Sequence, residues 1–398
     1  MSKLNKIFYG SAGTGKTREA NIEAVKIIHK SEKLDFNFNK DDYSSILSSF
    51  RSFSETQKLN LSSDKTKEIH NMVKVDNIKL YPEEIERLTN GTIKSEAISI
   101  IKSYKEKLTI YPLIETVTFH PSYSYQDFVE GITIDTIEVE KNNKIIKEII
   151  YTVKDGIFKK ICDRARANKG YQYVLIIDEI NRGDISSIFG ELFTLLEDTK
   201  REGEDEALSI NLPYSKDKAT GNPKKLIVPS NLHIVATMNT VDKSIALIDV
   251  ALRRRFEFIE MKPKYELLSS DIEGINLEKM LEAINERISI LKNEHYQIGH
   301  SYFLEDKITN FSDLKNVMTK NIIPLLQEYF YDDWRSVCAV LNQSYDKPIH
   351  NKGIFDIKKA NEKMFASEFN ELIEFNNKKI VTIRNFEHDD IKDIYQAV

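Results

Sequence analysis

The chain has 398 residues, of which 41% are hydrophobic and 30% charged, and its 14 glycines and 9 prolines are too few for a fibrous or low-complexity protein. A formal charge of −5 argues against a chain that holds nucleic acid mainly by overall charge. Its two cysteines form no CxxC pair and no apolar run is long enough to span a membrane, so we expect a cytoplasmic protein without disulfides, zinc or membrane contact.

The chain begins with a predicted strand at residues 5–9, a glycine-rich loop, and a helix at residues 18–30 with apolar positions at helical spacing. The loop consists of Gly10, Ser11, Ala12, Gly13, Thr14, Gly15, Lys16 and Thr17. It fits the phosphate-binding pattern G-x-x-x-x-G-K-[ST], in which backbone N–H groups curl around phosphate oxygens. We expect Lys16 to reach the β- and γ-phosphates and the Thr17 hydroxyl to ligate Mg²⁺. A chance glycine-rich turn is the alternative, which the strand–loop–helix context disfavours.

Residues 31–112 are rich in Lys, Ser, Asn and Asp and carry no motif, so we interpret them as a peripheral insertion of helices and loops. Strands and helices then alternate. We expect a strand at 115–120, a short helix at 124–131, a hairpin of 132–139 with 145–153, and a helix at 155–168. Next we expect a buried strand at 173–178 and a helix at 185–199. After these we expect a hairpin over 207–229, with Pro213, Gly221 and Pro223 in its turn, and strands at 232–238 and 256–261. This alternation predicts an α/β fold with a parallel sheet.

The pattern changes after Pro263, where amphipathic segments without glycine predict helices at 276–293 and 312–330. A late β-like segment at 379–383 has no assigned place. We therefore predict an α/β nucleotide-binding domain over residues 1–262 and a mainly helical domain over residues 263–398.

Two acids, Asp178 and Glu179, end the most apolar strand of the predicted sheet. Ligands of open α/β sheets bind at the carboxyl ends of the strands. We expect Asp178 to hold Mg²⁺ through water and Glu179 to polarise the attacking water. A surface acidic pair is the alternative, and the phosphate loop in the same chain disfavours it.

Asn239 and a run of arginines are further candidates. Asn239 follows the next buried strand, where an amide can orient the water or contact the γ-phosphate, although such an Asn is also a common turn residue. Arg253–Arg255 precede the last strand and form either a solvated face or, as we favour, a source of an arginine supplied in trans.

Together these segments resemble a known family. The resemblance covers residues 5–30 and 115–335 and rests on Phe119–Gly131, Asp178–Gly183, Met238–Ser244, Ala251–Phe256 and Ile298–Phe303. The chain resembles AAA+ ATPases, in the clade with an insert in helix 2 and a hairpin before sensor 1. More specifically it resembles the McrB family, the GTP-dependent motor subunits of modification-dependent, type IV restriction systems.

The resemblance implies a hexameric ring that binds nucleotide and Mg²⁺ between subunits, a helical lid, and an McrC-like nuclease partner through which DNA is engaged. It makes Asn239 the sensor 1 residue, Arg254 the leading trans finger, Arg255 its neighbour and His300 a lid residue near the nucleotide. The element Asn239–Asp242 matches the family signature that goes with GTP, which adds Asp242 to the nucleotide-binding residues. Because Val241 replaces the usual Ala and Lys243 the usual Arg, ATP stays the alternative.

McrB proteins commonly carry an N-terminal domain that reads modified DNA, and here the phosphate loop begins at residue 10. We therefore expect no such domain: either the chain is trimmed, or recognition lies in residues 31–112 or in a partner.

Two other functions compete with a restriction motor. A MoxR-type chaperone, which shares the helix-2 insert, would remodel a protein client. The Asn239–Asp242 element and Gly299–Phe303 favour the restriction motor. A nucleotide switch without turnover has no need of a water-activating acid such as Glu179.

Overall fold

The computed structural model describes residues 4–31, 113–141, 144–217, 219–241, 250–349, 352–359 and 379–396. The predicted insertion at 31–112 therefore lies, apart from its first residue, outside the described part. The chain divides into two compact units. The first comprises Met1–Tyr9, Lys16–Met238 and Ser244–Ile259, and the second comprises Gly10–Gly15, Asn239–Lys243 and Glu260–Val398. The phosphate loop is thus shared, because its first six residues belong to the second unit and Lys16 and Thr17 to the first.

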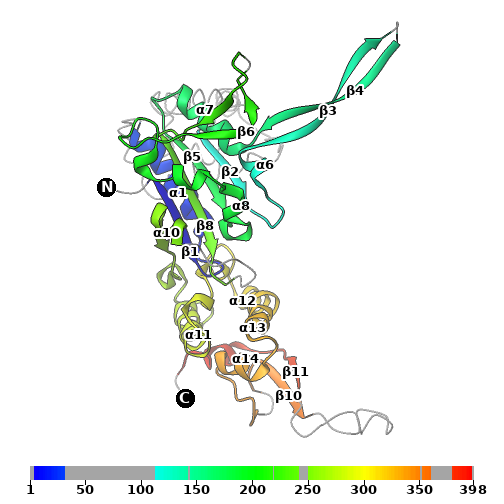
Figure 1. The fold of residues 1–398 in the computed structure, drawn as a ribbon. Helices are drawn as coiled ribbons and strands as arrows, with labels where there is room; N and C mark the ends of the chain where they lie inside the picture. The colour runs from blue at the N-terminus through cyan, green and yellow to red at the C-terminus, as the bar shows by residue number, and fades with distance from the viewer. Residues whose placement is uncertain are drawn as a thin grey trace, which may run out of the picture. The chain divides into compact units, whose positions relative to one another are not determined.

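The first unit is built on a five-stranded sheet of order β2-β5-β8-β1-β9 (Figure 1). Its strands are β1 (Asn5–Gly10), β2 (Ile114–Thr118), β5 (Tyr173–Asp178), β8 (Leu232–Asn239) and β9 (Glu257–Glu260). Strand β5 pairs in parallel with β2 on one side and β8 on the other. Its first five residues are fully buried, as expected for a central strand of a parallel sheet covered on both faces. All five strands were predicted, and the mostly parallel α/β arrangement is confirmed.

Helices α1 (Lys16–Ser31) and α7 (Ile157–Ala167) both pack against β5. The predicted helix over residues 185–199 is wrong, because the segment forms two short helices, α8 (Ile185–Phe189) and α9 (Leu192–Leu195). Gly190 separates them with a φ of 49°, a left-handed value that glycine adopts readily and that ends a right-handed helix. The described part of this unit also contains α6 (Tyr125–Phe128) and α10 (Val250–Arg255).

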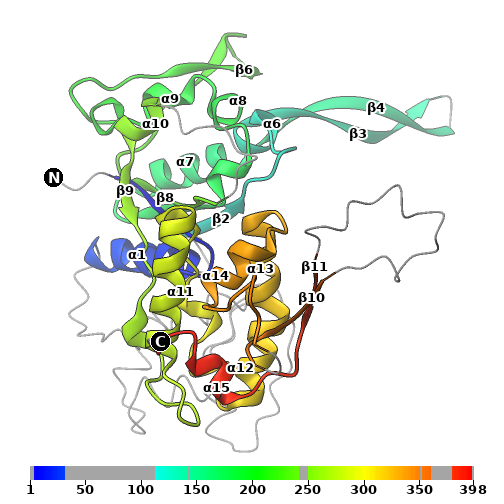
Figure 2. The ribbon, with the colours of Figure 1, turned by 90° about the horizontal axis from the view of Figure 1, so that it is seen from below.

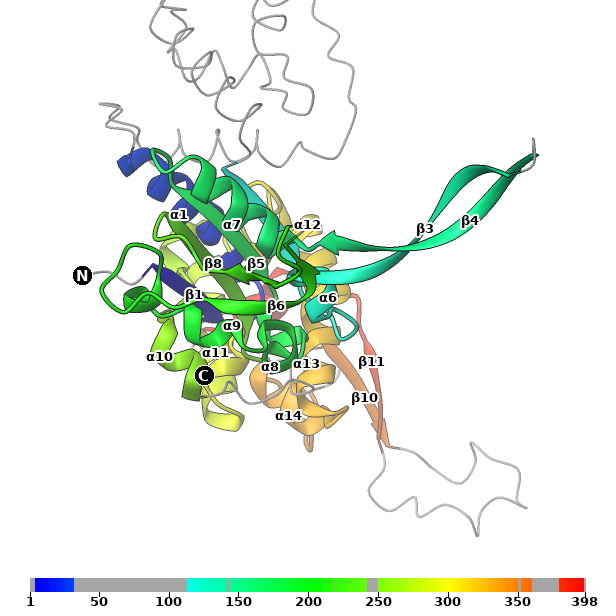
Figure 3. The ribbon, with the colours of Figure 1, turned by 45° about the horizontal axis from the view of Figure 1, so that its top comes forward.

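Two hairpins extend the first unit. Strands β3 (Glu130–Lys141) and β4 (Lys144–Asp155) pair antiparallel along their whole length and project away from the sheet as a long ribbon (Figures 1 and 3). Strands β6 (Ile210–Lys216) and β7 (Pro223–Leu226) form the second hairpin. Pro213 lies inside β6 instead of in the predicted turn, within the stretch where the register is irregular. Proline has no N–H to donate to a ladder, which fits its place in that irregular stretch.

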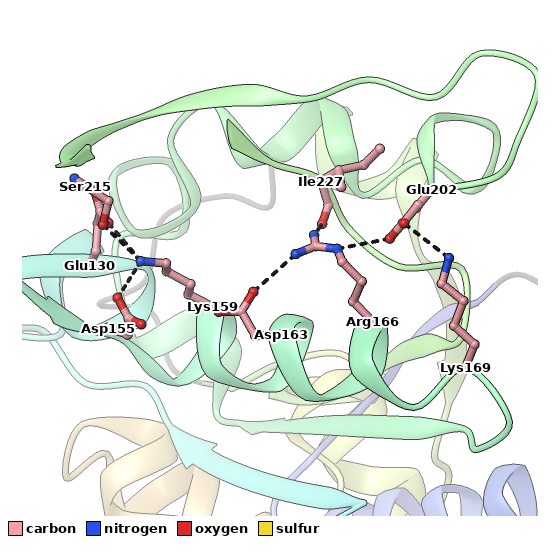
Figure 4. A network of polar contacts seen from close by, with 9 residues as sticks. All are labelled: Glu130, Asp155, Lys159, Asp163, Arg166, Lys169, Glu202, Ser215 and Ile227. Atoms are coloured by element: carbon pink, nitrogen blue, oxygen red, sulfur yellow. Dashed lines mark hydrogen bonds and ion pairs between the residues drawn. The ribbon is translucent and has the colours of Figure 1, made fainter. Parts of the chain in front are cut away.

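A buried polar network joins the bases of these two hairpins (Figure 4). One carboxylate oxygen of Glu130, the fully buried first residue of β3, accepts hydrogen bonds from the backbone N–H groups of Tyr214 and Ser215, at 2.7 and 2.9 Å. The other oxygen accepts from the Ser215 hydroxyl and from Lys159 of α7, which also pairs with Asp155. Burial alone would raise the pKa of Glu130, but these hydrogen bonds outweigh it and hold that pKa below its ordinary value.

The second unit is mainly helical in its C-terminal part (Figure 2). The α-helices among its described residues are α11 (Leu277–Leu291), α12 (Phe311–Val317), α13 (Ile323–Phe330), α14 (Trp334–Val340) and α15 (His388–Lys392). A π-helical stretch, Met318–Ile322, joins α12 to α13, so the predicted helix at 312–330 runs without interruption. Residues such as Leu281, Ile284, Leu314 and Leu326 are fully buried in its hydrophobic core.

The unassigned β-like segment becomes β11 (Lys379–Ile383), which pairs antiparallel with β10 (Phe355–Lys359). Through the described ranges of both units, no helix combines the length and the apolarity needed to cross a bilayer.

Candidate functional site

Within the first unit, the start of α1 meets the end of β5. The Thr17 hydroxyl donates a hydrogen bond to Asp178 Oδ1 at 3.1 Å, and Lys16 is nearly buried beside it in the chain. A hydroxyl and a carboxylate oxygen are hard donors of the kind that Mg²⁺ prefers, and this cation keeps several waters and needs few protein ligands. Thr17 and Asp178 therefore fit a Mg²⁺ site, and the structure brings these two predicted residues together.

The carboxyl end of β5 has a distinctive backbone. Glu179 follows the strand with φ 53° and ψ 47°, a left-handed conformation that is uncommon for a residue with a side chain. Its backbone N–H donates to the Thr237 hydroxyl at 3.1 Å, and the same hydroxyl donates to Asp178 Oδ1. The Glu179 carboxylate lies 3.4 Å from Nε of Arg182. Sequence reasoning missed Thr237 and Arg182, and the only local signal for Thr237 is a hydroxyl within a mostly apolar strand.

Within the second unit, the phosphate loop contacts the segment that follows α11. The N–H of Gly299 donates to the carbonyl of Ala12, and the N–H of Ser301 donates to the carbonyl of Gly13, both at 3.0 Å. Gly13 and Gly15 have φ of +79° and +80°, which only glycine adopts without strain. These two hydrogen bonds from Gly299 and Ser301 to the phosphate loop form what we call the loop–lid contact.

His300 lies beside the same loop. It is buried, and its Nδ1 accepts a hydrogen bond from the backbone N–H of Lys264 at 3.2 Å. An accepting Nδ1 in a neutral imidazole leaves the proton on Nε2. That Nε2 atom lies 3.9 Å from the position that a Cβ on Gly15 would occupy, so His300 presents a hydrogen-bond donor at the loop.

A small polar pocket of about 60 Å³ opens beside the start of the loop, also within the second unit. Its lining residues are Gly10, Ser11, Glu260, Met261, Lys262, Pro263, Glu294, His295 and Gln297. Ligand pockets are typically about 300–1,000 Å³, so this pocket by itself is too small to hold a nucleotide.

Asn239 is the last residue of β8, and its Oδ1 accepts a hydrogen bond from the N–H of Val241 at 3.3 Å. The side chain therefore takes part in a local turn, which was the alternative interpretation of this residue. Asp242 lies outside the described residues.

The three consecutive arginines in the last turn of α10 have different surroundings. Arg255 is mostly buried and forms an ion pair with Glu197 at 2.7 Å. The guanidinium of Arg253 lies 5.1 Å from the ring centre of Phe258. The side chain of Arg254 is exposed. Arg253 and Arg255 thus contact side chains of their own unit.

Two protein families match the chain. The family described as "AAA domain (dynein-related subfamily)" matches residues 89–256, and the family described as "McrB, alpha-helical lid domain" matches residues 276–338. The first match begins after the phosphate loop, which the long segment at 31–112 separates from the rest of the sheet.

Two curated proteins are similar to this chain. The "Type IV methyl-directed restriction enzyme EcoKMcrB subunit" of Escherichia coli (strain K12) is 35% identical over 237 residues, which cover 55% of this chain and 48% of the relative. The "Type II restriction enzyme BsuMI component YdiS" of Bacillus subtilis (strain 168) is 28% identical over 228 residues, covering 50% and 66%. The chain thus spans about half of the first relative and about two thirds of the second.

The fold and these matches agree on one architecture. The parallel sheet with its two hairpins is an AAA module, and the helices that follow Pro263 include the McrB-type lid. Over residues 89–256 and 276–338 the chain is therefore similar to AAA domains and to the lid of McrB proteins.

Proposed function

We propose that this chain is a Mg²⁺-dependent nucleoside triphosphatase that hydrolyses GTP as the motor of a restriction complex. The observation that carries the proposal is the contact of Thr17 with Asp178, which joins the phosphate-binding motif to an acid at the end of the central strand. Both curated relatives are named as restriction-enzyme components, which supports the same setting.

In this proposal each residue has a separate task. Loop N–H groups and Lys16 bind the β- and γ-phosphates, while Thr17 and Asp178 hold Mg²⁺. The bound cation neutralises charge that develops on the phosphate oxygens. Glu179 accepts a proton from the water that attacks the γ-phosphate, and Asn239 orients that water. His300 donates from Nε2 beside Gly15, where it contributes to nucleotide binding.

The proposed assembly uses Arg254, whose side chain is exposed. A neighbour's arginine completes the site in a closed ring whose interfaces are head to tail, and we propose a hexamer. An McrC-like nuclease binds this ring and engages DNA. The preference for GTP rests on the resemblance of Asn239–Asp242 to the family signature.

One hydrolysis experiment tests the proposal. The wild-type protein is given GTP and ATP with Mg²⁺, beside Glu179→Gln and Lys16→Ala, and phosphate release and nucleotide affinity are measured. Glu179→Gln keeps the side-chain shape but removes the base, so binding is retained and turnover falls by about 10²-fold or more. Lys16→Ala weakens binding itself, because it removes the cation that faces the phosphates.

Each part of this experiment has a result that would contradict the proposal. Wild-type turnover by Glu179→Gln would remove this residue from its role as base. Tighter binding and faster turnover of ATP would replace GTP by ATP while leaving the rest of the site intact. If neither the single chain nor the assembled protein hydrolyses GTP or ATP, the proposal that the chain is an enzyme is wrong.

A further inference from the structure

We propose that Thr237 is a positioning residue of the hydrolytic centre, whose hydroxyl couples the metal-binding carboxylate of Asp178 to the backbone of Glu179. This inference rests on the proposed function, because it assigns a role within that site. Thr237 is 1% exposed and stands in β8, one strand away from the two acids. A hydroxyl buried in an apolar strand costs free energy unless it is hydrogen-bonded, so its partners are informative.

The direction of each hydrogen bond is determined by chemistry. The backbone N–H of Glu179 can only donate, so the Thr237 oxygen accepts from it at 3.1 Å. An ionised carboxylate can only accept, so the single hydroxyl proton of Thr237 points to Asp178 Oδ1. The hydroxyl therefore bridges two consecutive residues, Asp178 at the end of β5 and Glu179 after it.

Glu179 needs such support because of its backbone conformation. In an extended strand, successive side chains point to opposite faces, so two adjacent acids would diverge. At φ 53° and ψ 47° the chain turns at Glu179, and this left-handed conformation costs about 1–2 kcal/mol for a residue with a Cβ. The Glu179 N–H donates a hydrogen bond to the Thr237 oxygen on the neighbouring strand β8, and this bond stabilises the left-handed conformation of Glu179.

Asp178 is constrained by the same hydroxyl. Its Oδ1 accepts from Thr237 on β8 and from Thr17 on α1, so the carboxylate is oriented from two elements. When Thr17 and Asp178 hold Mg²⁺, Thr237 still orients the carboxylate from the side of the sheet. Groups that orient a metal ligand in this way typically contribute about 10–100-fold to metal affinity or activity.

The test compares Thr237→Val, which keeps the shape and loses the hydroxyl, with Thr237→Ser, which keeps the hydroxyl and loses a methyl group. We expect Thr237→Val to lower kcat about 10–100-fold and to weaken Mg²⁺ binding by a similar factor, the latter measured without turnover by isothermal titration calorimetry with a non-hydrolysable triphosphate present. The KM for the nucleotide should stay within about 2-fold, because Lys16 and the loop are unchanged. Thr237→Ser should keep most of the wild-type kcat and Mg²⁺ dependence.

Thr116→Val is the matched control, since it makes the same replacement at an exposed position of β2, and it should behave as wild type. If circular dichroism shows that Thr237→Val does not fold, Thr237→Ala replaces it in the comparison with Thr237→Ser.

Two results would overturn the inference. Equal losses of kcat in Thr237→Ser and in the variant without a hydroxyl would mean that Thr237 acts by packing. Wild-type kcat and Mg²⁺ dependence in the variant without a hydroxyl would mean that the hydroxyl has no role. A wild-type protein that hydrolyses no nucleotide would instead overturn the proposed function and this inference with it.

Discussion

At the scale of single residues, an added Cβ would approach its neighbours most closely at Gly299 among the glycines that the structure describes. A Cβ at this position would lie 1.9 Å from the carbonyl carbon of Gly13 and 2.4 Å from the nitrogen of Thr14. Both atoms belong to the backbone, so no side-chain rotation relieves the overlap. The absence of a side chain at Gly299 is therefore what permits the loop–lid contact.

We predict that Gly299→Ala weakens nucleotide binding by about 10-fold or more. Overpacking of this kind costs about 1–3 kcal/mol, and about 1.4 kcal/mol corresponds to a factor of ten in affinity. Titration with a fluorescent triphosphate measures the effect. Gly170→Ala is the control, because no atom lies within 4 Å of the added Cβ, and it should bind as wild type. Unchanged affinity in Gly299→Ala would show that the loop tolerates displacement.

At the scale of elements, helix α7 forms hydrogen bonds at two points with the β6–β7 hairpin and the residue after it, which precede β8 in the chain. Lys159 in its first half donates to the hydroxyl of Ser215 in β6 at 3.0 Å. Arg166 at its end donates to the carbonyl of Ile227, which follows β7, at 2.6 Å. Glu130, at the start of the β3–β4 hairpin, accepts hydrogen bonds from Lys159 of α7 and from the backbone of β6. The two hairpins and α7 therefore form one connected substructure (Figure 4).

Glu130→Gln should lower the free energy of unfolding at neutral pH by about 1.5–3 kcal/mol, the range for hydrogen bonds to a charged group. The folded-state pKa of Glu130 lies below its ordinary value, so its contribution is present above about pH 4.3 and is lost as the pH falls through the folded pKa. The difference between wild type and variant should therefore shrink below pH 4. Denaturant unfolding followed across this range checks it.

The control for this prediction is Glu138→Gln, the same change on the same strand. Glu138 is exposed and its ion pair with Lys147 is 4.0 Å long, so its loss should change stability by less than about 0.5 kcal/mol. A difference between wild type and Glu130→Gln that does not depend on pH would contradict the role assigned to the charge.

At the scale of the whole molecule, the site as proposed is incomplete in one copy, because Arg254 is to act on the nucleotide of a neighbour. The chain should then be largely monomeric without nucleotide and hexameric with a non-hydrolysable triphosphate and Mg²⁺. Alone, Arg254→Ala should bind nucleotide nearly normally and hydrolyse it slowly, since an arginine finger contributes about 10³–10⁵-fold. Arg253→Ala, whose side chain lies over Phe258 of its own unit, should hydrolyse at close to the wild-type rate.

Mixing Arg254→Ala with Lys16→Ala sharpens this prediction. Each variant lacks a different half of the shared site, so some mixed interfaces combine an intact loop with an intact finger, and activity should exceed that of either variant alone. Native mass spectrometry confirms that mixed rings form. If they form and activity does not rise, Arg254 acts within its own subunit or has no part in hydrolysis.

The sequence alone determined the features that short segments encode. The phosphate loop follows from its spacing of glycine and lysine, and the five strands of the sheet from runs of apolar and β-branched residues. The hairpin β3–β4 follows from alternation around a polar turn. Asp178 and Glu179 were recognisable because a buried strand ends in an acid. Each of these signals is contained in one continuous stretch of the chain, so periodicity and motif spacing suffice to find it.

Only the tertiary structure decided which distant groups meet. Thr237 contacts Asp178 across 59 positions, and Gly299 contacts Ala12 across most of the chain. The ion pair of Arg255 with Glu197 likewise has no signal in the neighbouring sequence. Gly190 could be read as tolerated within a helix until its φ of 49° showed that the helix ends there. The physical reason is common to all four: backbone conformation and side-chain hydrogen bonding are set by which strands and loops lie side by side, and composition and periodicity do not contain that information.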